Sequence, residues 1–143
     1  MRTVAQFLVG RSGPIWAVHP DNTVREALVL MAEHNIGAVL VLVESRLAGV
    51  FSERDYAGKE ALQGRSSGST PVREIMTSKV ICVGPEQPIE DCMELMTHHH
   101  IHHLPVVKGD NLLGMISIGD VVREMMAEQK YLIEQLHHYI AGR

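Results

Sequence analysis

The 143-residue chain is predicted to fold as an α/β (α+β) protein, with two tandem β-α-β-β-α units packed through their sheets in pseudo-two-fold symmetry. Two observations predict this class. Residues 18–56 align without a gap on residues 83–121, and ten of the 39 aligned pairs are identical, so one pattern occurs twice. Within each copy, β-type segments alternate with apolar residues at helical spacing. One such unit buries too little surface to be stable alone, so the two sheets are expected to share a core.

The repeat also sets the expected domain boundaries. Residues 1–62 form the first unit, residues 63–70 form a linker rich in Gly, Ser and Thr, and residues 71–143 form the second unit with an extended C-terminal helix. A weaker similarity precedes each copy, where residues 3–8 resemble residues 71–76. The two units are therefore expected to begin alike.

Each copy opens with a short β segment and a helix. The β segments cover residues 15–18 and 80–83, and a proline follows each of them. The first helix is signalled by Thr23 and Glu26, which have the spacing of a capping box. In the second copy, Pro88 suits the first helical position, where its missing N–H is not needed. Apolar residues at i, i+3, i+4 and i+7 then give each helix one buried face.

Two strands and a second helix complete each copy. The apolar runs 38–43 and 104–107 are typical of strands covered on both faces, and each is followed by a polar turn and a hairpin partner. A helix is expected to begin near Ser52 and near Ser117. The latter helix continues to Ala141, where a glycine follows, and it carries one apolar side.

Composition excludes several classes of protein. The net charge of −4 leaves no excess of basic residues for a nucleic-acid-binding face. The longest apolar run has six residues, far fewer than the roughly 20 needed to cross a bilayer, and we expect neither a signal peptide nor a membrane partner. Two cysteines fit reduced thiols, so a cytoplasmic location is expected. Common catalytic motifs are absent from the sequence, and we expect no enzyme activity.

One short motif occurs in both copies at the start of the second helix. Gly49-Val-Phe-Ser52-Glu-Arg-Asp55 and Gly114-Met-Ile-Ser117-Ile-Gly-Asp120 share a glycine, two apolar residues, a serine and, three positions later, an aspartate. With the repeat and the segment His103-Leu-Pro-Val106, this motif resembles a pair of cystathionine β-synthase (CBS) domains, also called a Bateman module. Residues 51–59 and 64–67 are closer still to a bacterial subgroup of short, stand-alone pairs. The resemblance covers essentially the whole chain.

The resemblance implies a regulatory module without catalysis. Such modules bind adenosine-containing ligands, such as AMP, ATP, NAD or S-adenosylmethionine, in clefts between their units, and no cofactor is required. Two modules commonly form a disc through their helices. We therefore expect a homodimer that binds an adenine nucleotide and acts on a regulated protein of unknown identity.

The resemblance also implies which residues bind the ligand. It places Asp55 and Asp120 on ribose hydroxyls, and Ser52 and Ser117 on ribose or phosphate. The chemistry agrees, because a carboxylate can accept hydrogen bonds from two neighbouring hydroxyls and a helix N-terminus attracts phosphate. The same spacing fits a purely structural capping role, and the two interpretations are compatible.

Adenine is expected against the first strand of each copy, where backbone groups can bind the base edge and apolar side chains can cover its faces. The predicted contacts are Ile15, Trp16 and Ala17 in one site, and Lys79, Val80 and Ile81 in the other. Trp16 is the only tryptophan, and it also fits a core or interface position without a ligand.

Charged residues distinguish the two expected sites. Arg54, Lys59 and Arg65 are cations near the motif acid Asp55, whereas only uncharged residues directly precede Asp120. We therefore expect the site of the first motif to prefer the more anionic ligand, and the site of the second motif to tolerate a neutral or diffusely charged one.

The chain departs from the bacterial subgroup at two positions. Gly58 stands where the subgroup often has an arginine, and His102 stands where another arginine often precedes the histidine equivalent to His103. These changes weaken the expected anion contacts at neutral pH. His103 itself remains an expected ligand contact.

Five of the nine histidines fall within residues 98–103, which raises an alternative to nucleotide sensing. Imidazole binds zinc, nickel and copper, so a metal-responsive protein is conceivable. No acid or thiolate stands at a matching ligand spacing, and the first three histidines suit a helix C-terminus, so we assign no metal ligands. A second alternative is a dimeric scaffold with degenerate sites. A bound adenine nucleotide separates sensing from the scaffold, and tight stoichiometric metal would favour the metal-responsive protein.

Overall fold

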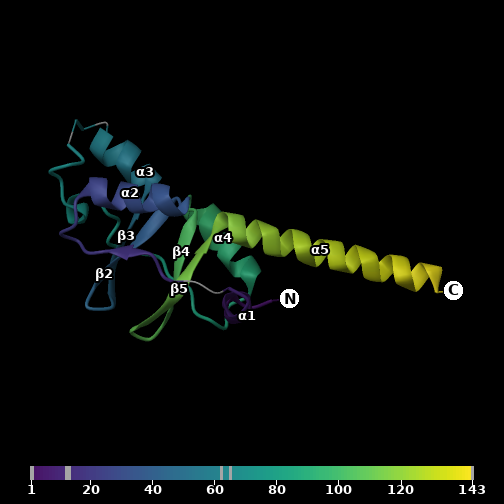
Figure 1. Ribbon diagram of the computed structural model, residues 1–143. Coiled ribbons are helices and arrows are strands. Elements are labelled where there is room, and N and C mark those ends of the chain that lie inside the picture. Colours follow the sequence, from purple (N-terminus) through teal and green to yellow (C-terminus); the bar gives the residue numbers. More distant parts are fainter. Residues whose placement is uncertain (1, 12–13, 62, 65, 143) are drawn as a thin grey trace.

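The computed structural model describes residues 2–11, 14–61, 63–64 and 66–142, arranged as Figure 1 shows. The elements form two similar series, which confirms the predicted mixed α/β class. The first series is α1 (Val4–Val9), β1 (Ala17–Val18), α2 (Val24–His34), β2 (Ala38–Val43), β3 (Arg46–Ser52), α3 (Glu53–Asp55) and a short π-helix, η1 (Tyr56–Ala61). The second series is a 3₁₀ turn, η2 (Val72–Glu74), α4 (Ile89–His99), β4 (His103–Lys108), β5 (Asn111–Ser117) and α5 (Ile118–Ala141).

Caps determine where the first helix of each copy begins and ends. Thr23 Oγ1 accepts a hydrogen bond of 3.1 Å from the Glu26 N–H, and the Glu26 side chain accepts one of 3.3 Å from the Thr23 N–H, so the predicted capping box is present. Pro88 is the cap of α4 and not its first residue, because its ψ of 152° is extended. Asn35 and His100 end α2 and α4 in the left-handed conformation, with φ values of 52° and 54°.

The strands form two small sheets. β1 pairs in parallel with β2, β2 pairs antiparallel with β3, and β4 and β5 form a second hairpin. Both first strands are shorter than predicted: β1 covers two residues, and residues 80–83 contribute only a parallel bridge between Val83 and Val106. The residues that leave the sheets line the cavities described below.

The segment that leads into each copy packs on the opposite unit. Val4 of α1 is fully buried in the core of the second unit, and Thr3 forms a backbone bridge with Pro88. In the same way, Val72 and Ile75 are buried in the core of the first unit. The two units are therefore intertwined by an exchange of their leading segments.

A third core cluster lies where the two sheets meet. Ala38, Leu40 and Val50 are buried there, and residues of the second copy, including Val80 and Met115, pack against them. This contact confirms that the units pack through their sheets.

α5 is the longest element and extends away from the rest of the fold (Figure 1). Its first turns pack against α4 and bury Val121, whereas residues 129–142 are all exposed. The predicted extension to Ala141 is confirmed. Among the described residues, no helix has the length and apolar character needed to span a membrane.

Candidate functional site

Both motif serines begin a helix, as predicted. Ser52 Oγ accepts a hydrogen bond of 3.2 Å from the Asp55 N–H, and Asp55 Oδ2 accepts one of 2.9 Å from the Ser52 N–H. Ser117 and Asp120 form the same reciprocal pair, at 3.2 and 2.8 Å. The capping interpretation is therefore confirmed in both copies, and each carboxylate is held at a helix N-terminus.

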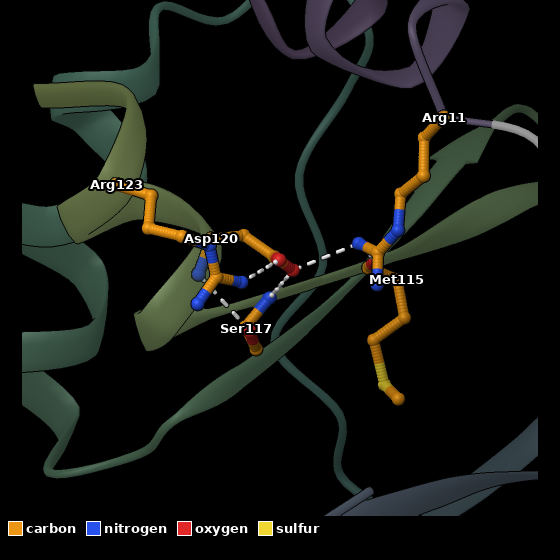
Figure 2. Close-up of polar contacts among 5 residues, drawn as sticks. All are labelled: Arg11, Met115, Ser117, Asp120 and Arg123. Carbon is orange, nitrogen blue, oxygen red and sulfur yellow. Dashed lines mark hydrogen bonds and ion pairs between the residues drawn. The ribbon is translucent and has the colours of Figure 1, made fainter. Parts of the chain in front are cut away.

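Each motif acid also binds a side chain from the segment that leads into the other copy. Thr77 Oγ1 donates to Asp55 Oδ1 at 3.0 Å, and Arg11 Nη1 donates to Asp120 Oδ2 at 2.8 Å (Figure 2). Arg11 also donates to the Met115 carbonyl oxygen at 3.3 Å. Each acid is thus tied to the opposite unit, in one case by a neutral hydroxyl and in the other by a cation.

The expectation that Asp120 has no charge beside it was wrong. Arg11 binds Asp120 Oδ2, and Arg123 Nη2 donates to Oδ1 at 2.8 Å (Figure 2). Neither arginine adjoins the motif in sequence, because Arg123 lies one helical turn later and Arg11 lies near the N-terminus. Burial raises the pKa of Asp120, but the Ser117 backbone N–H and hydroxyl and the Arg11 guanidinium outweigh it and hold the pKa below the ordinary value of 3.8.

The second motif lines a cavity of about 560 Å³, the Asp120 cavity, which also involves the first copy. Ile15 and Trp16 line it together with Ser117 and Asp120. A volume of this size is typical of small-molecule sites, which span roughly 300–1,000 Å³. The motif of the second copy therefore faces the first-strand segment of the first copy.

The first motif lines a cavity of about 820 Å³, the Asp55 cavity, built in the same crossed way. The residues from the second copy are those predicted to contact adenine: Lys79, Val80 and Ile81. The residues from the first copy are the predicted ribose and anion contacts: Ser52, Arg54, Asp55 and Lys59. Both groups are predicted from the sequence, but which first strand faces which motif is evident only from the fold.

Three cations line the Asp55 cavity. Arg54 Nη1 donates to the His100 carbonyl oxygen at 2.5 Å, so the end of α4 holds this guanidinium in place. Lys59 Nζ lies 3.4 Å from Asp55 Oδ1, and Lys79 also lines the cavity. Arg65, the third cation expected near Asp55, lies outside the described residues.

Trp16 and Ala17 lie in different surroundings. The Trp16 ring stacks on the His34 ring, with centroids 3.5 Å apart and 14° between the planes, while the residue also lines the Asp120 cavity. Ala17 is not among the lining residues; it pairs with Leu40 in the sheet and packs against the core between the sheets. Trp16 therefore lies where a base could bind, and Ala17 does not.

His103 and Gly37 line both cavities. A methyl group added at Gly37 would lie 3.4 Å from His103 Cε1, so the imidazole lies against this glycine. Burial lowers the pKa of His103, the neighbouring His102 lowers it further, and the opposing effect of Asp120 is smaller, so the pKa lies below 6.5. The predicted ligand contact His103 therefore lies between the two cavities, where it is predominantly neutral at pH 7.

Three residues of the site were missed from the sequence. Arg123 could have been found, because i and i+3 positions share a helix face. Thr77 and Arg11 stand shortly before the first-strand segments, and no local pattern relates them to the motif acids. Only the exchange of leading segments brings them there.

Among the residues that the structure describes, the histidine-rich segment takes part in no metal cluster. Within the described residues, which include all of 98–103, no three or more His, Cys, Asp or Glu side chains are placed to hold one metal ion. His98 and His99 contact each other edge to face, with ring centroids 4.7 Å apart.

Fold and site together define a class of protein: two intertwined α/β units with a ligand-sized cavity wherever the serine–aspartate helix start of one meets the strand edge of the other. The profile of the CBS domain family matches residues 9–59 and 72–127. The chain belongs to the CBS domain family, as the resemblance implied.

Individual relatives agree with this assignment. The chain is 45% identical over 127 residues to the CBS domain-containing protein CBSX3, mitochondrial, of Arabidopsis thaliana, which covers 85% of this chain and 62% of that relative's length. A structure of a protein with CBS domains from Burkholderia ambifaria MC40-6 matches with a TM-score of 0.85 and 48% identity, over 90% of this chain and 96% of that one. The CBS domain pair of protein MJ0100, solved in complex with 5′-methylthioadenosine and S-adenosyl-L-methionine, matches with a TM-score of 0.76 and 25% identity, over 89% and 98% of the two chains.

Proposed function

We propose that this chain is a regulatory module that binds an adenosine-containing ligand, such as AMP, ATP, NAD or S-adenosylmethionine, and that it has no catalytic role. The observation that carries the proposal is the crossed construction of both cavities. Each one combines a carboxylate at a helix N-terminus with an apolar strand segment of the opposite copy. The MJ0100 complex with two adenosine compounds supports this ligand class.

The motif acids are the groups suited to ribose. Asp120 Oδ1 accepts a hydrogen bond from Arg123, and each carboxylate oxygen has two lone pairs, so this oxygen can also accept from a ribose hydroxyl. Asp55 Oδ1 accepts a hydrogen bond from the Thr77 hydroxyl and lies 3.4 Å from Lys59 Nζ. Because the Lys59 side chain is half-exposed, a ribose hydroxyl can displace it. Hydrogen bonds to charged groups are worth about 1.5–3 kcal/mol each, so loss of either acid is costly to binding.

The Asp55 cavity is the better candidate for the phosphate groups of the ligand. Arg54, Lys59 and Lys79 line it, and the Arg54 guanidinium is already fixed by the end of α4. In the Asp120 cavity the two arginines are engaged by Asp120 itself. Their presence nevertheless means that this second cavity is not restricted to neutral ligands.

A homodimer through α5 is part of the proposal. Val122, Met126, Ile133, Leu136 and Ile140 are exposed apolar residues that recur every three to four or seven positions, so they lie on one side of the helix. Helices of about 12–15 residues are marginal when isolated in water, so the exposed half of α5 needs a partner. A second copy offers the same stripe in a two-fold arrangement, the commonest symmetry of oligomers. A cytoplasmic location and a regulated partner protein also stay predictions.

A thermal-shift panel of AMP, ADP, ATP, NAD, NADH and S-adenosylmethionine, with GMP as the control base, tests the ligand class. A ligand at 100 times its Kd stabilises the folded state by about 2.7 kcal/mol. For a domain of this size, that corresponds to a shift of roughly 5–11 °C. If no adenosine compound raises Tm at millimolar concentration, the scaffold with degenerate sites is the better account. Tight stoichiometric metal after chelator treatment would instead favour the metal-responsive protein.

A further inference from the structure

We propose that the two cavities are energetically coupled through His103, so that an anionic ligand in one cavity weakens the binding of an anionic ligand in the other. This inference rests on the proposed function, and it adds how the two sites influence each other.

The first observation is that Gly37 and His103 form a wall shared by the two cavities. Of the residues that line the Asp55 cavity and those that line the Asp120 cavity, only Gly37 and His103 belong to both sets within the described chain. The imidazole lies directly against Gly37, with the ring atoms Cε1 and Nε2 at 3.4 and 3.6 Å from where a Cβ would stand. A ligand that fills either cavity up to this wall contacts the same side chain.

The second observation is how the wall is attached. The Glu53 N–H, the first of α3, donates to the Gly37 carbonyl oxygen at 3.1 Å. The Ile118 N–H, the first of α5, donates to the His102 carbonyl oxygen at 2.9 Å, and His103 pairs with Ser117 in the β4–β5 ladder. The wall is therefore bonded to the start of both motif helices, and a displacement at one site reaches the other through packed, hydrogen-bonded atoms.

The sign of the coupling follows from the chemistry of the ring. A neutral imidazole carries one N–H and one lone pair, so it can donate to only one of two anions. Around this ring lie Asp120, whose charge is balanced by Arg11 and Arg123, the neighbouring His102, and Glu53, whose Oε2 is 3.9 Å from the Gly37 Cβ position. The burial that keeps His103 uncharged also reduces solvent screening between two anions that approach it from opposite sides.

Calorimetric titration with AMP tests the coupling. Asp55→Ala and Asp120→Ala each weaken one cavity and leave the other intact, so at AMP concentrations too low to fill the weakened cavity their isotherms give the affinity of the intact one. For independent sites, the wild-type isotherm equals the sum of these two. We expect instead that the second wild-type binding step is at least about fivefold weaker than the weaker single-cavity step, within the usual range of coupling between sites. Trp16 is the only tryptophan and lines the Asp120 cavity. A change in its fluorescence therefore shows which of the two binding steps fills that cavity.

His103→Gln removes the titrating ring and keeps a polar side chain, and His102→Gln is the matched control, because His102 lines only the Asp55 cavity. We expect the isotherms of Asp55→Ala and Asp120→Ala, each combined with His103→Gln, to sum to the titration of His103→Gln, and the same comparison in the His102→Gln background to fail. A wild-type isotherm equal to the sum would overturn the inference and leave the proposed function intact. The same holds if the coupling survives in His103→Gln, or if AMP binds in only one cavity of every variant. If no variant releases or absorbs heat when AMP is added, the inference is overturned for AMP-like anions. The thermal-shift panel of nucleotides tests the proposed function separately.

Discussion

Thr77 Oγ1 donates a hydrogen bond of 3.0 Å to Asp55 Oδ1, which joins the motif of the first copy to the leading segment of the second. Arg11 and Asp120 form the equivalent contact in the opposite direction, at 2.8 Å. Both contacts depend on the exchange of leading segments between the units. Neither copy alone therefore contains a complete cavity, and a bound ligand would contact both.

The contact between Gly49 and the Thr77 backbone predicts a sharp difference between two glycines. A Cβ at Gly49 would lie 2.6 Å from the Thr77 carbonyl oxygen, and Thr77 is paired to Val50 by two backbone hydrogen bonds of 2.9 Å. Gly49→Ala should therefore reduce the free energy of unfolding by about 1–3 kcal/mol. Gly58→Ala is the control, because nothing lies within 4 Å of its Cβ position. Urea denaturation checks the pair, and equal stabilities of the two variants would contradict the packing described here.

His103 predicts a specific loss of stability at acidic pH. Its pKa is lowered in the folded state by burial and by His102, so between the unfolded pKa near 6.5 and the lower folded pKa only the unfolded chain takes up the proton. The stability present above pH 6.5 is therefore lost as the pH falls through this window. His103→Gln should lose less free energy of unfolding between pH 7.5 and pH 5.5 than the wild type does.

Denaturant titrations at the two pH values measure this difference, and His102→Gln controls for the removal of a neighbouring histidine. An unchanged pH dependence in His103→Gln would show that this imidazole does not resist protonation in the fold.

The local signals in the sequence predicted the elements better than the sites. Thr23, Ser52 and Ser117 each cap a helix as predicted, because a cap depends only on residues three positions apart. Pro88 is misplaced by one position, since the same fixed φ suits both the cap and the first helical residue.

The sites depend on packing between units, which no local pattern encodes. Asp55 and the segment 79–81 are each predicted from the sequence, yet only the exchange of leading segments shows that they share a cavity. The same exchange brings Arg11 to Asp120, which reversed the expectation of an uncharged site. The position of His103 between the cavities likewise depends on the contact of one copy with Gly37 of the other.

Arg54 predicts a difference between charged and uncharged ligands. Arg54→Ala should weaken AMP binding by about 10- to 150-fold, the value of a charge-assisted hydrogen bond, and adenosine binding much less. Arg46→Ala is a suitable control, because Arg46 is exposed in the β2–β3 hairpin and lines neither cavity. Calorimetry with both ligands decides, and equal losses for AMP and adenosine would assign Arg54 a structural role at the end of α4.

Gly58 offers the converse experiment. It lines the Asp55 cavity, has open space at its Cβ position, and is the position where the resemblance to the bacterial subgroup implies an arginine. Gly58→Arg should strengthen AMP binding more than adenosine binding, because a further guanidinium can reach the phosphate. A Gly58→Arg variant that folds normally but does not bind AMP more tightly would place the phosphate elsewhere.

The exposed stripe of α5 predicts a dimer that a single charge can disrupt. Sedimentation equilibrium at micromolar concentration should give twice the chain mass of 15.9 kDa. Leu136→Glu should shift the equilibrium to the single chain, because it places a charge within the stripe. Tyr131→Glu should not, although Tyr131 is equally exposed, at 60% against 61%, because it lies on the opposite side of the helix. A wild type that sediments as a single chain would contradict the dimer.

The most direct test of ligand binding at the motif acids is calorimetric titration of the double variant Asp55→Ala/Asp120→Ala with the adenosine compound that stabilises the wild type most. Loss of the acid should cost about 0.3–1 kcal/mol of stability at Asp55, and more at the buried Asp120, which also loses its contacts with Arg11 and Arg123, so circular dichroism must first show that the variant folds. Removing the ribose contact should weaken binding by about 1.5–3 kcal/mol, or about 10- to 150-fold, at each occupied cavity. A folded double variant that binds the compound as tightly as the wild type does would contradict the account and leave both acids as helix caps.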